Sequence, residues 1–293
     1  MLGLHDAAYR AAADREVRYL LHQTPRWENG AISHRSEYPE LWADFIFMVP
    51  PFLAYQAIVT EDEQLLDLAI KQCTLYAEVL STGTVWKHII GPVDRPQRDT
   101  RLWATGNGWV AAGLVRVLAT GLHAFPNRGS QNLSAGIEKL IELTSNLIEG
   151  AVTSATNGTP PMLCNYLDDS EYFGDVAGTA LIAASAFRLA QLAPEKYSKR
   201  HLDWAEEAWK NIEKVVANRN GDVGPTPMPG VATSRIPCQK GSSQGHSFVV
   251  MCFAARRDWL QKQEGKMHDS SPFAYWRDQA KRGLKAWFEW LWR

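Results

Sequence analysis

The chain has few of the features that mark nucleic-acid, membrane or disulfide-stabilised proteins. Its 31 lysines and arginines are balanced by 32 aspartates and glutamates, and no basic block occurs, so nucleic acid is not an expected partner. No run reaches the roughly 18 apolar residues of a membrane helix, so no membrane partner is expected. Its 4 cysteines are scattered and form no C-x-x-C pair, which predicts neither a disulfide framework nor a metal site. No cofactor is expected either.

Alternating β-branched runs and hairpin signals are also scarce, which leaves helical periodicity as the dominant pattern. Helices with one apolar face are expected over residues 61–80, 134–149 and 197–217. Segments that are apolar nearly all round, and must be covered on most sides, are 109–122, 177–192 and 248–255. Because the two kinds alternate, the sequence predicts an all-α double ring with inner helices wrapped by outer ones, about nine helices in all.

Long turn-rich stretches separate these helices, over residues 26–39, 83–101, 157–170 and 218–245. Several exceed the usual helix–helix connection of about 2–8 residues, and long loops at one end of a rigid scaffold are where sites are often built. No flexible linker, low-complexity tract or charge run divides the chain. A single domain over residues 1–293 is the simplest prediction.

Asp44 is the best candidate for a catalytic group. It lies between Trp42 and Phe45 in a run that is otherwise apolar. Desolvation in such a place raises the pKa of a carboxyl group and favours the neutral acid, as a proton donor at neutral pH requires. The alternative is that Asp44 caps the start of a helix or binds a nearby backbone N–H.

Aromatic and histidine residues suggest how a ligand would be held. Most of the 12 tryptophans are expected in the core, but some would stack on the faces of sugar rings. Trp103 and Trp109 flank a Gly-Asn-Gly turn that opens an apolar helix, either as ligand walls or as inward-packed side chains. His88, in a loop after Lys87, is a polar partner for a sugar hydroxyl or for the catalytic carboxyl, or else a histidine satisfied by its loop.

Taken in order, these segments resemble glycoside hydrolase family 105, the unsaturated rhamnogalacturonyl hydrolases, and the related family 88. The segment from Trp42 to Phe52 is similar to that family's Trp-x-Asp-x-x-aromatic-Met-x-x-Pro-Phe. His88 follows as in its histidine loop, and Trp103 to Trp109 matches Trp-x-x-x-x-Gly-Trp. Weaker matches are Asp175 to Ala180 and Gly245 to Val249. The likeness covers roughly residues 26–260 and is greatest to the fungal branch.

The resemblance implies an (α/α)6 barrel of the six-hairpin glycosidase type and an oligosaccharide substrate. That substrate would carry a 4,5-unsaturated galacturonyl residue, left by a lyase on fragments of pectin or rhamnogalacturonan. Asp44 would protonate C4 of the enol ether, water would add at C5, and the hemiketal would collapse to free the next sugar. One acid/base suffices, without the paired carboxylates of ordinary glycosidases. The substrate-binding residues implied are His34, Arg35, Trp42, His88, Trp103, Asn107 and Trp109.

The chain departs from the family in two respects. Many members have an arginine, suited to the substrate carboxylate, where this chain has Thr105; His34, Arg35 or Lys87 would then supply the cation. The resemblance also begins early, so roughly three N-terminal helices, with the family's second active-site aspartate, are expected to be missing. Localisation stays open: cytoplasmic as written, or secreted if a signal peptide belonged to the missing part.

Two other functions compete with this one. A catalytically inactive or truncated sugar-binding homologue would explain Thr105 and the short N-terminus, whereas it would have no need of Asp44. A serine hydrolase is suggested only by the segment Gly241 to Gly245, which matches G-x-S-x-G. That motif needs a preceding buried strand, and residues 235–240 do not resemble one.

Overall fold

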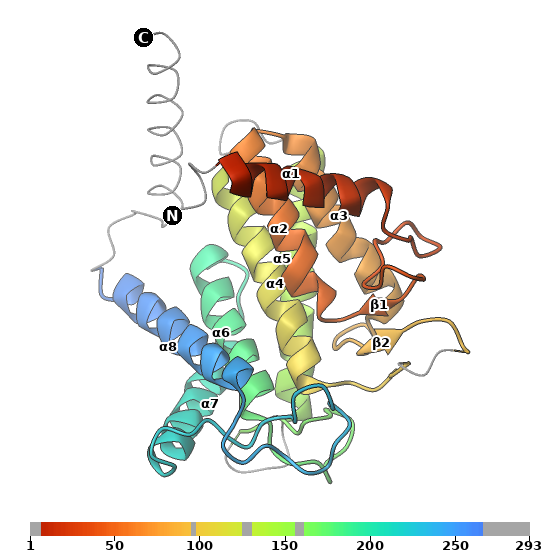
Figure 1. The fold of residues 1–293 in the computed structure, drawn as a ribbon. Helices are drawn as coiled ribbons and strands as arrows, with labels where there is room; N and C mark the ends of the chain where they lie inside the picture. Colours follow the sequence, from red (N-terminus) through yellow and green to blue (C-terminus); the bar gives the residue numbers. More distant parts are fainter. Residues whose placement is uncertain (1–6, 95–97, 125–130, 156–160, 266–293) are drawn as a thin grey trace.

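The computed structural model describes residues 7–94, 98–124, 131–155 and 161–265 of the chain. Within these ranges it has eight helices and two very short strands (Figure 1). The elements are α1 (Ala7–His22), β1 (Leu41–Trp42), α2 (Phe45–Thr60), α3 (Glu63–Leu80), β2 (Ile89–Ile90), α4 (Ala104–Ala124), α5 (Gln131–Ser154), α6 (Val176–Leu192), α7 (Lys199–Ala217) and α8 (Ser243–Gln263). Residues 157–160, which begin the expected loop 157–170, lie outside the described residues.

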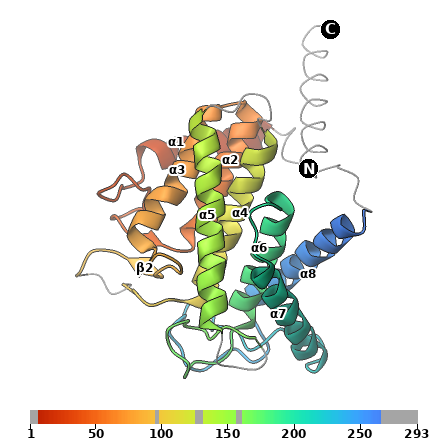
Figure 2. The same ribbon diagram turned by 180° about the vertical axis from the view of Figure 1, so that it is seen from behind.

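The helices form two layers, as the alternation of sequence patterns predicts. In the inner layer α2, α4, α6 and α8 follow one another, each in contact with the next. In the outer layer α3, α5 and α7 pack against them, and α5 stands in front of α4 when the molecule is viewed from behind (Figure 2). Nearly every residue of α6 is buried, whereas α7 buries one face through Leu202, Ala205, Trp209 and Ile212. The helical prediction is therefore confirmed.

One expectation about coverage is wrong. The segment 248–255 was expected to be covered on most sides, yet in α8 the side chains of Val250 and Phe253 are 65% and 52% exposed. The reason is that α8 has α6 on one side and only slight contact with α7 among the described elements. No helix in the described ranges is long and apolar enough to cross a membrane.

Close packing of α2 against α4 brings two candidate segments together. A Cβ atom at Gly113 of α4 would lie 2.1 Å from the carbonyl oxygen of Ile46, in the first turn of α2. Only glycine allows the two backbones to approach so closely. The first turn of α2 therefore lies against the middle of α4. A Cβ atom at Gly106, in the first turn of α4, would lie 3.6 Å from Cβ of Ala43, so the start of α4 is close to the residue that precedes Asp44.

The long loops join these helix starts through short backbone pairings. β1 and β2 are antiparallel, with Trp42 opposite Ile89, and Ile89 also pairs with Asp99. Trp103 pairs with Tyr166 from the loop that precedes α6. The loops before α6 and α8 lie together below the helices in Figure 1, so several long loops share one end of the scaffold, as expected.

Candidate active site

Asp44 occupies the position before the first turn of α2 but does not act as a cap. Its backbone is helical, with φ −54 and ψ −33, and its side chain makes no capping hydrogen bond. One carboxylate oxygen, Oδ2, is buried without a hydrogen-bond partner. Its nearest charged neighbour is Nε2 of His88, at 3.5 Å, which is an electrostatic contact at the outer limit of hydrogen bonding. The capping alternative therefore does not describe this residue.

His88 is fixed next to Asp44 by the backbone on both sides. Its carbonyl oxygen accepts a hydrogen bond from the N–H of Ala43 at 2.8 Å, and its N–H donates to the carbonyl of Arg101 at 2.9 Å. These bonds place the imidazole between the segment that leads into α2 and the segment that leads into α4. Nδ1 of the ring lies 2.9 Å from Oδ2 of Asp99. Each ring nitrogen of His88 thus faces a carboxylate.

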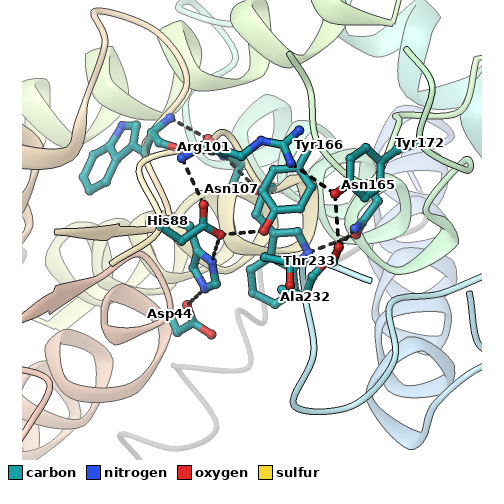
Figure 3. Close-up of polar contacts among 12 residues, drawn as sticks. Asp44, His88, Arg101, Asn107, Asn165, Tyr166, Tyr172, Ala232 and Thr233 are labelled. Carbon is teal, nitrogen blue, oxygen red and sulfur yellow. Dashed lines mark hydrogen bonds and ion pairs between the residues drawn. The ribbon is translucent and has the colours of Figure 1, made fainter. Parts of the chain in front are cut away.

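Asp99 is the centre of a second set of contacts. Its Oδ2 also accepts a hydrogen bond from the Tyr166 hydroxyl at 2.5 Å, and its Oδ1 accepts from the backbone N–H of Arg101 at 3.1 Å. The guanidinium of Arg101 lies 4.1 Å from the centre of the Tyr166 ring. Figure 3 shows the continuous line of polar contacts from Asp44 through His88 towards Tyr166.

The charges of this line are set by burial and by its neighbours. Burial lowers the pKa of the His88 imidazole, but contacts with Asp44 and Asp99 outweigh burial and the pKa is raised above its ordinary value. Burial raises the pKa of the Asp99 carboxyl, but bonds from His88 and Tyr166 outweigh it and that pKa is lowered. Burial and the Asp99 carboxylate both raise the pKa of Tyr166, so its hydroxyl stays a donor. The geometry therefore favours anionic Asp99 beside a readily protonated His88.

Aromatic rings line the same region. The imidazole of His34 stacks on the Trp42 indole with 4.8 Å between centroids, and the Trp42 ring lies 5.7 Å from that of His88. The His88 ring also lies 4.5 Å from the Trp103 ring, measured between centroids. Trp103 is held by a 3.0 Å hydrogen bond from its Nε1 to Asn165. Burial lowers the pKa of His34 and so disfavours its charged form.

Arg35 brings a positive charge to this ring cluster. Its guanidinium carbon lies 4.7 Å from the centre of the Trp42 ring, and its Nε is 3.4 Å from Oε2 of Glu40. The same Glu40 oxygen accepts a hydrogen bond from Trp42 Nε1 at 2.5 Å. Glu40 is fully buried, whereas the Arg35 side chain is 36% exposed. Glu40 therefore orients both side chains while leaving Arg35 accessible.

Two other predicted binding residues have different surroundings. Asn107 is fully buried, and its side chain hydrogen-bonds the backbone of Trp86 twice and the carbonyl of Trp103 once. It thereby ties the His88 loop to the start of α4. Trp109 packs against Phe47 and Phe248, each at 4.6 Å between centroids. Direct substrate contact by Asn107 and Trp109 stays a prediction.

Thr105 is committed to a buried contact. Its hydroxyl donates to Oδ2 of Asp175 at 2.6 Å, and that carboxylate also caps α6 by accepting from the backbone N–H groups of Ala177 and Gly178. Burial raises the pKa of Asp175 to about 6. Thr105 is 1% exposed, so it offers no group to a ligand.

The structure thus joins His34, Arg35, Trp42, Asp44, His88 and Trp103, and it adds residues that sequence reasoning missed. The additional residues are Glu40, Asp99, Asn165 and Tyr166. Asp99 lies only four positions before Trp103, in a turn-rich stretch already considered for a site, so its charge was an available signal. Tyr166 gave no such signal, because only the pairing of two loops brings it to Asp99.

A separate groove of about 330 Å³ lies between α4, α6 and α8 and contains none of the residues above. Its lining is largely apolar, with Arg116, Arg188 and Asp258 among its polar members. It is therefore not part of the candidate site. In the described part of the chain, no group of three or more histidine, cysteine, aspartate or glutamate side chains is placed to hold a metal ion.

The chain is similar to a known family of enzymes. Residues 3–226 match the sequence profile of Glycosyl Hydrolase Family 88. The chain belongs to glycosyl hydrolase family 88. That match includes the Asp44, His88 and Trp103 segments, and no protein of curated function matches the sequence.

Solved structures share the fold. A possible member of glycoside hydrolase family 105 from Salmonella enterica has a TM-score of 0.73 at 17% identity, over 87% of this chain and 67% of its own. A second, from Klebsiella pneumoniae, has a TM-score of 0.71 at 18% identity, over 86% and 66%. An unsaturated glucuronyl hydrolase specific for heparin has a TM-score of 0.57 at 11% identity, over 87% and 70%.

These likenesses place the family 88 chain in the six-hairpin glycosidase fold, which confirms the predicted fold class. The chain spans about two thirds of the length of the first two of these structures. At such identities the likeness shows the fold alone.

Proposed function

We propose that this family 88 chain is a glycoside hydrolase that removes a 4,5-unsaturated uronic acid from the end of an oligosaccharide. Asp44 is the acid that protonates C4 of the enol ether and the base that then takes a proton from water adding at C5. The resulting hemiketal collapses and frees the next sugar. A single acid/base is enough, because the double bond supplies the reactive carbon.

The observation that carries this proposal is the state of the Asp44 side chain. An aspartate at a helix start ordinarily accepts a hydrogen bond from the first turn. Here the carboxylate makes no such bond, and its buried Oδ2 faces His88 instead. A carboxyl group left unsatisfied beside a titrating imidazole is suited to exchange a proton with a ligand.

The neighbouring rings support a sugar as that ligand. The indoles of Trp42 and Trp103 both lie near the His88 ring, at 5.7 and 4.5 Å between centroids. Flat rings of this kind pack against the apolar faces of pyranose rings. His34, Trp42, His88 and Trp103 are therefore proposed as the substrate-binding surface around Asp44.

Arg35 is proposed as the partner of the substrate carboxylate. Thr105, which stands where many relatives have arginine, is buried and bound to Asp175. Burial lowers the pKa of His34 and so disfavours its charged form, which makes it a poorer cation than Arg35. Arg35 lies over Trp42, close to Asp44 in the chain, and is partly exposed. A guanidinium can bind a carboxylate through two parallel hydrogen bonds.

The sugar is proposed to be of the unsaturated galacturonyl type, from pectin or rhamnogalacturonan fragments. Support comes from the family 105 motifs around Asp44 and from the two similar structures described as possible members of that family. The heparin-specific hydrolase of the same fold makes an unsaturated glucuronyl disaccharide the natural comparison substrate.

The test is hydrolysis of an unsaturated galacturonyl-rhamnose disaccharide, followed by loss of the absorbance of the double bond. Asp44→Asn is expected to lower kcat/KM by about 10²–10⁴-fold, because it keeps the shape but cannot deliver the proton. Arg35→Ala is expected to raise KM for the unsaturated acid while leaving its neutral methyl ester unaffected. The unsaturated glucuronyl disaccharide, run in parallel, reports the sugar preference.

Equal rates for the wild type and Asp44→Asn would overturn the assignment of Asp44. If calorimetry shows that the wild type binds the disaccharide but the assay detects no turnover, the chain is a sugar-binding homologue and not an enzyme.

A further inference from the structure

The two carboxylates next to His88 differ in their hydrogen bonding. Asp99 accepts three hydrogen bonds, from His88 Nδ1, the Tyr166 hydroxyl and the Arg101 backbone. At the opposite end, Asp44 Oδ2 is buried without a hydrogen-bond partner. No donor in the described part of the chain therefore satisfies Asp44 Oδ2.

The contact with Asp99 decides which nitrogen of His88 carries a fixed proton. An ionised carboxylate only accepts hydrogen bonds, so Nδ1 of His88 must be the donor in the 2.9 Å contact. In the neutral imidazole the other nitrogen, Nε2, then has a free lone pair. Nε2 lies 3.5 Å from Oδ2 of Asp44, at the outer limit of hydrogen bonding. The pair Asp44–His88 therefore has room for one shared proton between Oδ2 and Nε2.

We propose that Asp99 is a positioning residue, whose carboxylate holds the Nδ1–H of His88 so that Asp44 and His88 share the proton that Asp44 delivers to C4 of the sugar. This inference rests on the proposed function of Asp44. Tyr166 completes the arrangement by holding the Asp99 carboxylate in place through its 2.5 Å hydrogen bond.

The proton balance of the reaction is closed within this group. In the first step the O–H bond of protonated Asp44 breaks and its electrons stay on the carboxylate. A C4–H bond forms from the electrons of the double bond, and positive charge develops at C5 beside the ring oxygen. His88 is then neutral, with its Nδ1–H still bound to Asp99. In the second step water bonds to C5 and its proton returns to Asp44. Asp99 keeps its charge throughout.

The charges around His88 agree with this role. Asp44 faces it from the start of α2, Asp99 faces it from the segment after β2, and His34 lies nearby before β1. Burial lowers the pKa of His34 and disfavours its charged form, and the guanidinium of Arg101 is paired with Asp169 at 3.1 Å. The two carboxylates are thus the charges that set the proton affinity of His88, and both favour its protonation.

The chain offers a matched control at a distance from the site. His201 on α7 is also buried, and its Nε2 lies 2.9 Å from Oε2 of Glu149 on α5. Glu149→Gln removes the carboxylate partner of a buried histidine just as Asp99→Asn does. It lies outside the proposed machinery, so it reports what loss of a structural pair alone does.

The experiment is the pH dependence of kcat/KM for the unsaturated disaccharide in the wild type, Asp99→Asn and Glu149→Gln. Asp99→Asn is expected to lose on the order of 10²-fold at about pH 8 and much less at about pH 5, because the shared proton is lost at lower pH without the Asp99 charge. Tyr166→Phe is expected to lose less than Asp99→Asn. Glu149→Gln is expected to keep the wild-type profile. Equal loss by Asp99→Asn at both pH values would overturn the proposal.

A second measurement does not depend on activity. The imidazole nitrogens of ¹⁵N-histidine-labelled protein are titrated by NMR, with His88 assigned by its loss in His88→Gln. In the wild type the Nδ1 signal of His88 is expected to stay protonated while Nε2 titrates, and in Asp99→Asn this titration is expected to move to lower pH. An unchanged His88 titration overturns the role of Asp99 even if the wild type is active. A wild type without turnover but with the expected titration shift rejects the proposed function while supporting the proton pair.

Discussion

Two buried histidines, His88 and His201, show how the same contact serves different ends. Each places a ring nitrogen 2.9 Å from a carboxylate brought in from a different part of the chain. His88 has a second carboxylate, Asp44, facing its other nitrogen, whereas Nδ1 of His201 is buried without a hydrogen-bond partner. His88 therefore lies between two carboxylates, as the proposed proton sharing requires, whereas His201 contacts one carboxylate and joins two helices.

The location of the partner carboxylates reinforces the difference. Glu149 joins α5 to α7 in the outer layer, is 40% exposed, and also pairs with Arg200. Asp99 is 12% exposed and lies among the loops at the starts of the inner helices. Charges at the surface are screened by water, so Glu149 contributes little beyond a tether. The carboxylates of Asp44 and Asp99 are less screened by water, so they have a larger effect on the proton affinity of His88.

The sharpest test of this contrast is to remove each histidine in turn. His88→Gln is expected to lower kcat/KM on the unsaturated disaccharide by about 10²–10³-fold, because glutamine cannot take up the shared proton. His201→Gln is expected to leave kcat/KM near the wild-type value and to lower thermal stability instead. Steady-state assays with matched thermal melts separate the two outcomes. Similar losses of activity in both variants would remove the distinction between the pairs.

Asp175 extends the comparison to a buried carboxylate whose observed donors are all neutral. Its hydrogen bonds come from Thr105 and two backbone N–H groups, and burial raises its pKa to about 6. Thr105→Val is expected to lower the free energy of unfolding by about 1–3 kcal/mol at about pH 7.5, because it removes a donor from the charged form.

The pH dependence of that loss follows from the sign of the shift. The pKa of Asp175 in the folded state is about 6, above its unfolded value, so acidification from about pH 6 protonates the folded form first and favours folding. The destabilisation by Thr105→Val is therefore expected to shrink at about pH 5. Urea unfolding followed by tryptophan fluorescence measures it at both pH values, with Thr105→Ser, which keeps the hydroxyl, as control. A loss that grows on acidification would contradict this account.

The smallest expected effect is at Glu149. Burial raises the pKa of this carboxyl, but His201 and Arg200 outweigh burial and the pKa is lowered. A lowered pKa contributes stability above the unfolded value, and that contribution is lost as the pH falls through the folded pKa. Glu149→Gln is expected to cost about 1 kcal/mol or less at about pH 7, because the pair is partly exposed. Unfolding curves that still differ from the wild type at about pH 3 would contradict this origin.

Local sequence determined the helices and the layers to which they belong. Side chains that repeat every three or four positions bury one face of α3, α5 and α7, and the segments 109–122 and 177–192, apolar nearly all round, lie in α4 and α6. This information lies within each segment, so it can be read without knowing the fold. The prediction of burial was wrong for α8, where Val250 and Phe253 are exposed although the segment is apolar. Whether an apolar face is buried depends on which other helices pack against it, and the segment itself does not determine this.

The candidate site divides in the same way. The run around Asp44 and the motif from Trp103 to Trp109 were visible in the sequence because each group of residues is contiguous. The sequence alone could not tell whether Asp44 caps a helix or faces another side chain, since both are compatible with its neighbours. Only the pairing of β1 with β2, and of Trp103 with Tyr166, brings His88, Asp99 and Tyr166 into one line with Asp44. Contacts between residues far apart in the chain depend on loop geometry, which is why tertiary structure decided them.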